Sequence, residues 1–409
     1  MRWIIPIFIL LLLQWYSFQA VKTVTTHKWI WVSYLIFTAI VLGNLILNTL
    51  VFERAVTMDS KLMYAIGFFI ALFVFQMIVS IVILTEDIIR IPQTIYAYFT
   101  KFPGQVQFAP ERRTFISKLA VGLAAIPFTA LLYGMYRGKY NYKVFSYTLE
   151  YDDLPQAFDG FTITQISDLH SGSFDNVEKV NYGIDLVNRQ QSDLILFTGD
   201  LVNNKTDEVL PWIEHFSKLS APYGVYSVLG NHDYGDYTQW NSEEAKKHNF
   251  KNLCQAQKEM GWNLLLNESR FIEKEGERIA IIGVENWGKG GFKRAGDLNK
   301  SLEKVAPEDF KIVMSHDPSH WEAEIIPHPY KIHLTLSGHT HGMQFGIDIP
   351  GWFKWSPVKW RYKQWAGIYE LDNQRINVNR GFGFLAYPGR VGMWPEISVI
   401  TLKNSKRNV

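Results

Sequence analysis

Short clusters of aspartate, asparagine and histidine occur at five places between residues 168 and 341 of this 409-residue chain. Seven of their side chains are of types that ligate metal ions, namely Asp168, His170, Asp200, Asn231, His316, His339 and His341. Carboxylates, an amide oxygen and imidazoles together suit Mn, Fe or Zn better than Mg or Ca, and no thiolate accompanies them. The residue types therefore predict two divalent metal ions as cofactors.

Hydrolysis of a phosphate ester at neutral pH requires a nucleophile from water and charge compensation for the phosphoryl oxygens. Two metal ions roughly 4 Å apart meet both needs by sharing a bridging hydroxide. Asp200 is the predicted bridge, because an aspartate has two oxygens to share and a Gly-Asp turn brings the backbone close. The remaining ligands then fill two shells, with Asp168, His170 and His341 on one ion and Asn231, His316 and His339 on the other.

His232 follows Asn231 directly but faces the opposite way along the chain, so it is predicted to bind no metal and to protonate the leaving oxygen. Asp233 is predicted to orient the ring of His232. A single Asp-x-His or Gly-Asp is more often a turn than a ligand pair, but five such clusters in this order make a chance occurrence improbable. The other histidines match no motif and are interpreted as surface or core residues.

Each cluster follows a short apolar run that reads as a strand. These runs are residues 161–166, 194–198, 225–229, 311–315 and 332–337. Residues 279–284 form a further predicted strand, and residues 395–402 form the predicted closing strand. Residues 176–189 and 208–219 read as helices that cover a sheet. In layered α/β proteins ligands bind beyond the carboxyl ends of strands, so we expect the loops that carry the clusters to meet at one point.

The pattern Asp168-x-His170, Gly199-Asp200, Gly230-Asn-His-Asp233, His316 and Gly338-His-x-His341 resembles that of the calcineurin-like metallophosphoesterase family, over about residues 145–403. The resemblance implies a four-layer α/β/β/α sandwich, the ligands assigned above and His232 as the acid. It is nearest to membrane-associated bacterial members, some of which carry Arg-Arg-x-Phe before the domain and end in a Pro-Glu-Ile strand. Met343 departs from the glycine of many members, which leaves the pocket shape open.

Two arginines lie where similar proteins place a loop near the site. Arg380 follows Asn379, and Arg390 lies ten residues later. Either guanidinium is a candidate to bind a substrate phosphate through two parallel hydrogen bonds. The alternative for each is an exposed arginine without a role in binding.

Four apolar segments precede the clusters, at residues 3–21, 29–52, 62–85 and 119–136. The first three contain no charged residue, and each is long enough to cross about 30 Å of hydrocarbon as a helix. The fourth is shorter and contains glycine and proline, which membrane helices tolerate. We therefore predict an all-α multi-pass transmembrane region over residues 1–140, followed by a catalytic domain over residues 145–403. A cleaved signal peptide is the alternative for the first segment.

Arg112 and Arg113 predict the side of the membrane on which the catalytic domain lies. Counting lysine and arginine in the loops gives a tie. The stretch from Arg112 to Lys118 before the fourth segment looks like a twin-arginine export signal, which places the catalytic domain on the extracytoplasmic side of a bacterial plasma membrane. Two arginines that hold the cytoplasmic end of a helix are the alternative, and they predict the same orientation.

The composition limits the classes of partner and substrate that this protein is expected to bind. A formal net charge of +2 indicates no strongly basic face, so no nucleic-acid partner is expected, and the lone Cys254 excludes an internal disulfide. Tryptophans mixed with cations in residues 352–365 suit a membrane interface, unless they pack against their own domain.

We therefore predict a membrane-bound phosphohydrolase, with a lipid-linked phosphodiester or pyrophosphate ahead of a soluble phosphomonoester. One alternative is a membrane-anchored metal domain that binds a phosphorylated ligand without turnover, which an incomplete ligand set would favour. Another is a transporter with an appended domain, for which Asn44, Asn48 and Gln76 give thin support.

Overall fold

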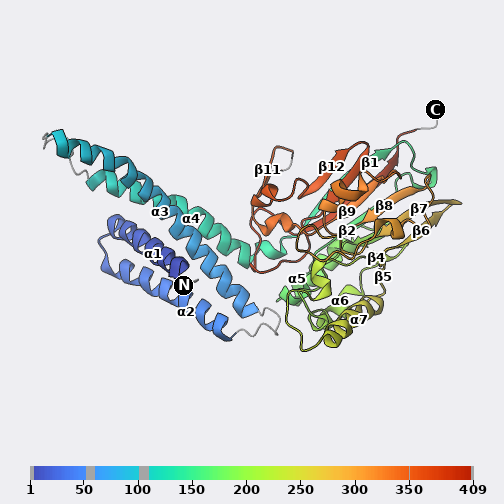
Figure 1. The fold of residues 1–409 in the computed structure, drawn as a ribbon, viewed down its shortest axis with the longest axis horizontal. Coiled ribbons are helices and arrows are strands. Elements are labelled where there is room, and N and C mark those ends of the chain that lie inside the picture. The colour runs from blue at the N-terminus through green and yellow to red at the C-terminus, as the bar shows by residue number, and fades with distance from the viewer. Residues whose placement is uncertain (1–3, 52–59, 101–109, 350, 407–409) are drawn as a thin grey trace. The chain divides into compact units, whose positions relative to one another are not determined.

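A computed structural model describes residues 4–51, 60–100, 110–349 and 351–406 (Figure 1). The chain forms two compact units, a helical unit that ends at Met135 and an α/β unit that continues from Tyr136. Each unit has its own hydrophobic core.

The helical unit consists of four long helices, α1 Ile4–Val24, α2 Lys28–Val51, α3 Ser60–Thr100 and α4 Pro110–Tyr136. Each contains a stretch that is long and apolar enough to cross a membrane. Helices α3 and α4 extend beyond the predicted apolar segments. Charged residues continue both helices, and Glu86 of α3 pairs with Arg112 at 3.1 Å and with Arg113 at 2.7 Å of α4.

A small polar cluster joins three of these helices. Buried Gln76 of α3 donates hydrogen bonds to Gln14 of α1 and, at 3.1 Å, to Tyr34 of α2. The hydroxyls of Ser17 and Tyr34 are 2.6 Å apart. Hydrogen bonds of this kind hold helices together where lipid removes the hydrophobic driving force. Packing between the helices therefore explains why polar Gln76 lies inside an apolar segment.

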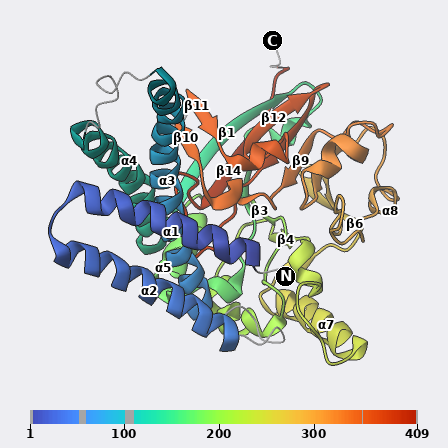
Figure 2. The same cartoon turned by 60° about the vertical axis from the view of Figure 1, so that its left-hand side comes forward.

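The α/β unit is built on two six-stranded sheets, strands of which are labelled in Figures 1 and 2. The first has the strand order β1-β14-β2-β3-β4-β5, and the second β12-β13-β9-β8-β7-β6. The strands of the first sheet are β1 Lys143–Tyr151, β2 Thr162–Ile166, β3 Leu194–Phe197, β4 Val225–Ser227, β5 Asn263–Leu264 and β14 Glu396–Asn404. Those of the second are β6 Glu268–Lys274, β7 Glu277–Gly283, β8 Phe310–Met314, β9 Leu334–Ser337, β12 Gly367–Leu371 and β13 Gln374–Val378.

Alternating side chains separate the layers. In β3, Leu194 and Leu196 pack between the two sheets, whereas Ile195 and Phe197 contact the helices on the outer face. In β7, Ile279 lies between the sheets. Strand side chains alternate between faces, so strands that are buried on both sides are apolar throughout.

Helices cover both outer faces. Helices α5 Val177–Asn188, α6 Ile213–Phe216 and α7 Glu243–Glu259 contribute to the core outside the first sheet, and α8 Leu298–Ser301 contributes to the core outside the second. The predicted four-layer α/β/β/α sandwich is thus confirmed.

The predicted helix over residues 208–219 differs from the structure. Two 3-10 turns, Thr206–Glu208 and Leu210–Trp212, precede α6, which has four residues. Pro211 has no backbone N–H for a hydrogen bond inside a helix, and its ring restricts the preceding residue. The covering layer is therefore broken into short pieces at this point.

Candidate metal centre

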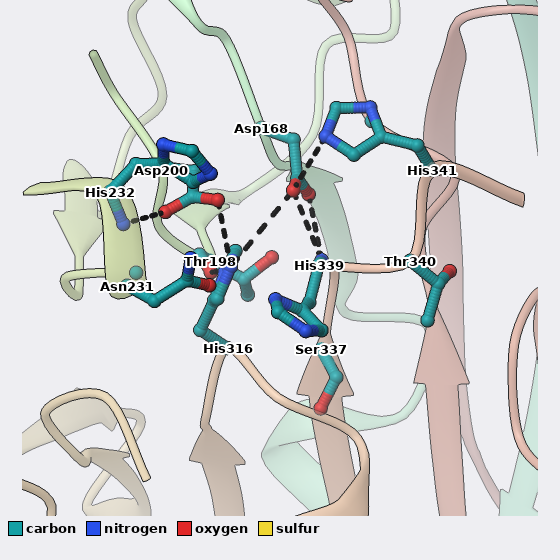
Figure 3. A network of polar contacts seen from close by, with 12 residues as sticks. Asp168, Thr198, Asp200, Asn231, His232, His316, Ser337, His339, Thr340 and His341 are labelled. Carbon is teal, nitrogen blue, oxygen red and sulfur yellow. Dashed lines mark hydrogen bonds and ion pairs between the residues drawn. The ribbon is translucent and has the colours of Figure 1, made fainter. Parts of the chain in front are cut away.

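The predicted ligands converge at the carboxyl ends of strands from both sheets. Asp168 and His170 follow β2, Asp200 follows β3, and Asn231 lies beyond β4. From the second sheet, His316 follows β8, and His339 and His341 follow β9. Figure 3 shows these loops meeting around one point, as expected where parallel strands end at a shared edge.

An unusual backbone conformation accompanies the ligand set. Five of the seven ligands have positive φ values, namely Asp168 at 52°, His170 at 48°, Asp200 at 59°, His339 at 70° and His341 at 51°. L-residues rarely adopt the left-handed region, and such strain concentrates at functional sites. The turns redirect side chains that an extended strand would send to alternate faces.

Two motif glycines allow the loops to approach one another. A Cβ on Gly338 would lie 2.0 Å from Ser167 Oγ and 2.2 Å from Asp168 Oδ2. At Gly199, which has φ +99°, a Cβ would lie 2.5 Å from the Gly230 nitrogen. Both positions require glycine because a side chain would push adjacent ligand loops apart.

Three side chains form the first group of donor atoms. The Nε2 atoms of His170 and His341 are 3.0 Å apart, and Asp168 Oδ1 lies 3.2 Å from His341 Nε2. Asp168 also accepts the backbone N–H of His339, at 3.0 Å to Oδ1. All three residues are buried, and their donor atoms lie within 4.8 Å of one another.

Asp200, His316 and His339 form the second group. Asp200 Oδ2 lies 3.1 Å from His316 Nε2 and 3.6 Å from His170 Nε2, so this one oxygen faces both groups. The other oxygen, Oδ1, accepts the backbone N–H of His232 at 2.9 Å. The geometry supports Asp200 as the shared ligand through a single oxygen.

Hydrogen bonds select the ligand nitrogen of three histidines. His170 Nδ1 lies 3.1 Å from Asn203 Oδ1, and His316 Nδ1 lies 2.8 Å from the Thr198 carbonyl. Both contacts leave Nε2 available for a metal. In His339 the two ring nitrogens exchange roles. Nε2 lies 2.8 Å from the Tyr362 hydroxyl, so Nδ1 is the nitrogen left available for a metal. Such partners fix the tautomer and the orientation of metal-binding histidines.

Asn231 completes the donor set. Its Nδ2 donates to the Tyr237 hydroxyl at 2.9 Å, whereas its Oδ1 is buried without a hydrogen-bond partner among the described residues. His316 Nε2 has no hydrogen-bond partner other than the ion-pair contact with Asp200 Oδ2 at 3.1 Å. Buried acceptors are rarely left unsatisfied. The orphaned atoms, together with the two groups of donors, fit two divalent metal ions.

The electrostatics favour cation binding. Burial opposes ionisation of Asp168 and Asp200, yet the neighbouring histidines hold the pKa of each carboxyl below its usual range. Burial lowers the pKa of His170 well below its usual value and that of His339 to about 4. These residues are thus in the forms that ligate metals. Burial opposes the charged form of His316, but Asp200 raises its pKa to about 10, so a metal ion competes with a proton there.

His232 lies beside the two groups and belongs to neither. Its ring is 4.9 Å from that of His170 between centroids and forms part of the wall of a cavity. Its Nδ1 lies 2.7 Å from the Asn203 carbonyl oxygen, which is the hydrogen bond that orients the ring. Figure 3 shows His232 next to Asp200 and Asn231.

The structure corrects the predicted role of Asp233. Its carboxylate accepts the backbone N–H groups of Gly230 at 2.8 Å, Asp200 at 3.0 Å and Leu201 at 2.8 Å, and no described contact joins it to the His232 ring. Burial and the charge of Asp200 raise the pKa of Asp233 to about 7. Asp233 therefore fastens two ligand loops together, and a backbone carbonyl, which residue types do not reveal, orients His232.

Arg380 and Arg390 are also placed differently from the prediction. Both are buried and neither lines the cavity. Arg380 pairs with Glu396 and, at 2.5 Å, with Asp348. Arg390 donates to the Gly383 carbonyl at 2.6 Å, and its Nη2 lies 3.1 Å from His341 Nδ1. Because both guanidinium groups are buried and paired inside the domain, their contacts support a role in the fold instead of the predicted role in substrate binding.

Arg380→Met is expected to destabilise the domain by about 3–5 kcal/mol, because it leaves the buried carboxylate of Glu396 and the partly buried carboxylate of Asp348 without their counter-charge. A thermal unfolding scan of the full chain in detergent measures the shift. Arg375→Met, which removes an arginine paired to the exposed Glu370, is the control and should have a much smaller effect. Unchanged stability of Arg380→Met with weaker substrate binding would contradict this assignment.

A cavity of about 580 Å³ opens over the metal groups. Its floor is polar and includes five of the seven predicted ligands, His170, Asp200, Asn231, His339 and His341, together with His232. Its walls are mostly apolar and consist of Phe292, Met343, Pro357, Val358, Trp360, Tyr362 and Leu385. Among the described residues that line the cavity, Arg361 alone carries a permanent positive charge. The cavity thus joins a floor of candidate metal ligands to predominantly apolar walls.

The two-sheet α/β sandwich and its buried carboxylate and histidine groups define a hydrolase of the metal-dependent class. Comparison with known proteins identifies the family. Residues 161–343 match the family model described as calcineurin-like phosphoesterase, and residues 1–139 match that described as probable calcineurin-like phosphoesterase, transmembrane domain.

The chain is similar to several metallophosphoesterases. It is 30% identical over 304 residues to the uncharacterized metallophosphoesterase YkuE of Bacillus subtilis, a match that covers 72% of this chain and 98% of that protein. It is 27% identical to YkoQ of the same organism, over 68% and 97% of the two chains. A transmembrane protein with metallophosphoesterase domain from Danio rerio is 26% identical, over 69% and 62%.

The chain therefore belongs to the calcineurin-like metallophosphoesterase family, and it is a phosphoesterase hydrolase and a membrane protein.

Proposed function

We propose that this chain is a membrane-bound phosphohydrolase with a dinuclear centre and that its substrate is a lipid-linked phosphodiester or pyrophosphate. The observation that carries the proposal is Asp200 Oδ2, which faces a histidine of each donor group. Two divalent ions, Mn, Fe or Zn, when bound there, supply a nucleophile from water and charge compensation for the phosphoryl oxygens. Residues 1–140 anchor the chain, and residues 145–403 carry out catalysis.

The protein's own residues complete the reaction. The Asn203 carbonyl fixes the His232 ring by accepting from Nδ1, so that Nε2 of the protonated ring donates to the leaving oxygen. Asp233 keeps the loops of Asp200 and Asn231 in register through backbone N–H groups. The apolar walls exclude water from the ester, which strengthens every charge interaction within the cavity.

We assign to Arg361 the substrate-binding role that the sequence predicted for Arg380 and Arg390. It lines the cavity, it is exposed, and its guanidinium lies 5.1 Å from the centre of the Phe292 ring. Among the described residues, no carboxylate forms an ion pair with the Arg361 guanidinium.

Arg361→Met is expected to lower kcat/KM by about 10-fold or more, since a hydrogen bond to a charged group contributes about 1.5–3 kcal/mol. Steady-state kinetics measure the loss. Arg278→Met, far along the second sheet, should leave the rate unchanged.

We place the catalytic domain on the extracytoplasmic side of a bacterial plasma membrane. The ion pairs of Arg112 and Arg113 with Glu86 support their role in holding a helix end, which favours the same side as an export signal does. Labelling of Arg361→Cys in intact cells with a membrane-impermeant thiol reagent tests the side, with the lone Cys254 first changed to serine. If the cysteine is labelled only in permeabilised cells, the catalytic domain lies on the cytoplasmic side and the proposed orientation is wrong.

The test of activity uses the full chain, purified in detergent. Metal analysis should find two ions of Mn, Fe or Zn per chain. Assays should then show hydrolysis of phosphodiesters or lipid pyrophosphates in preference to phosphomonoesters. Failure to hydrolyse any of these classes with all three metals added would contradict the proposal and leave a domain that only binds a phosphorylated ligand.

A further inference from the structure

A small hairpin stands apart from the two large sheets. Strands β10 Ile347–Ile349 and β11 Phe353–Trp355 form a two-stranded sheet of their own, and β11 projects from the α/β unit in Figure 1. Ile347 pairs with Trp355 and Ile349 with Phe353. Because directly paired residues lie on the same face of a sheet, these four apolar side chains share one face, which we name the apolar hairpin face.

The opposite face of the hairpin is polar and tied to the domain. Asp348 and Lys354 form the pair on this face. Asp348 accepts from buried Arg380 at 2.5 Å, and Lys354 donates to the Ala366 carbonyl. The hairpin therefore presents its polar side to the protein and its apolar side to the outside, the reverse of a hairpin adapted to water.

The apolar surface extends from the hairpin to the cavity. Trp352 is 81% exposed, Phe353 46% and Trp360 76%. The rings of Trp355 and Trp360 are 6.1 Å apart in an edge-to-face contact, and Trp360 lines the cavity above the metal groups. Trp365, in contrast, is buried in its own domain. Exposed tryptophans joined into one patch mark an interaction surface.

We propose that the apolar hairpin face, with Trp352 and Trp360, docks on the headgroup region of a lipid bilayer and admits a membrane-borne phosphoester to the cavity. For its substrate, this inference rests on the proposed function. Four helices that can cross a membrane keep the domain near a bilayer. Exposed Lys359 and Arg361 border the patch and complement anionic headgroups, while indole rings favour this depth.

Docking is tested on the full chain in liposomes of zwitterionic and anionic phospholipids. In a Cys254→Ser background, an environment-sensitive fluorophore is attached through Trp352→Cys or, as control, through Leu210→Cys, an exposed apolar position on the same unit. The label at 352 should shift to the blue, resist quenching by aqueous iodide and be quenched by spin-labelled headgroups. Equal iodide quenching at both positions would overturn the docking proposal whether or not the protein is active.

Activity tests the link to substrate. The double variant Trp352→Ser, Phe353→Ser lies outside the cavity lining. It should hydrolyse a soluble aryl phosphodiester normally and a vesicle-borne phosphoester lipid about 10-fold more slowly, as expected when apolar anchoring area is lost. The control Val177→Ser, Leu210→Ser should change neither rate. Equal losses on both substrates, or no loss on the lipid, would overturn the inference. A wild-type chain inactive on every substrate would count against the proposed function alone.

Discussion

Asp200→Asn is expected to lower phosphoester hydrolysis by about 10³-fold or more, which corresponds to ~4 kcal/mol of transition-state stabilisation. Asp200 Oδ2 lies within 3.6 Å of His170 Nε2 and 3.1 Å of His316 Nε2, so one carboxylate serves both donor groups. An amide keeps the shape of the side chain but loses its negative charge. Metal analysis should therefore find fewer than two ions per chain.

The matched control for this substitution is Asp185→Asn. Asp185 is exposed on α5, so the substitution makes the same change of charge away from the centre. Metal content and rate should stay as they are in the unaltered chain. Two retained ions and a normal rate in Asp200→Asn would show that the two groups do not share this carboxylate.

His232→Gln is expected to keep both metal ions and to lower kcat by about 10²–10⁴-fold on an ester with an alkoxide leaving group. The ring is outside both donor groups, so its removal costs no ligand. A nitrophenyl ester, whose leaving group needs no proton, should lose much less. Comparison of the two substrates separates proton donation from a structural effect.

His215→Gln serves as the control, because His215 bonds to Asn181 on the helical layer and lies outside the cavity lining. It should leave both rates intact. Loss of metal from His232→Gln would make His232 a ligand. Equal losses of kcat on the two esters would show that His232 is a positioning residue and does not donate the proton.

The ligand loops could be predicted because the relevant signals are local. An apolar run that ends in Asp-Leu-His170 or Gly-Asp200 indicates both a strand and its loop, and buried strands are apolar on both faces. The family resemblance then supplied the order of layers, which short runs alone do not contain. The roles of the individual ligands and of His232 remain predictions until the variants above are measured.

The remaining features depend on contacts between distant residues. The burial of Arg380 is set by Asp348 and Glu396, which are 32 and 16 residues away, and an arginine beside a motif resembles a binding residue in sequence. The partner of His232 is the backbone carbonyl of Asn203, a group that every residue possesses. The left-handed turns at the ligands leave only a weak signal in residue type, because aspartate and histidine are enriched in this conformation but adopt others more often.

The position of β14 delays completion of the first sheet until almost the whole α/β unit has been synthesised. This strand, the last described in the chain, lies between β1 and β2, parallel to one and antiparallel to the other. The membrane helices and every metal ligand are synthesised before β14 leaves the ribosome. Until then β2 has an unpaired edge, and non-local pairing of this kind is slow and prone to aggregation. Loss of β14 would leave both β1 and β2 without a partner on that side, so it should be more damaging than its length suggests.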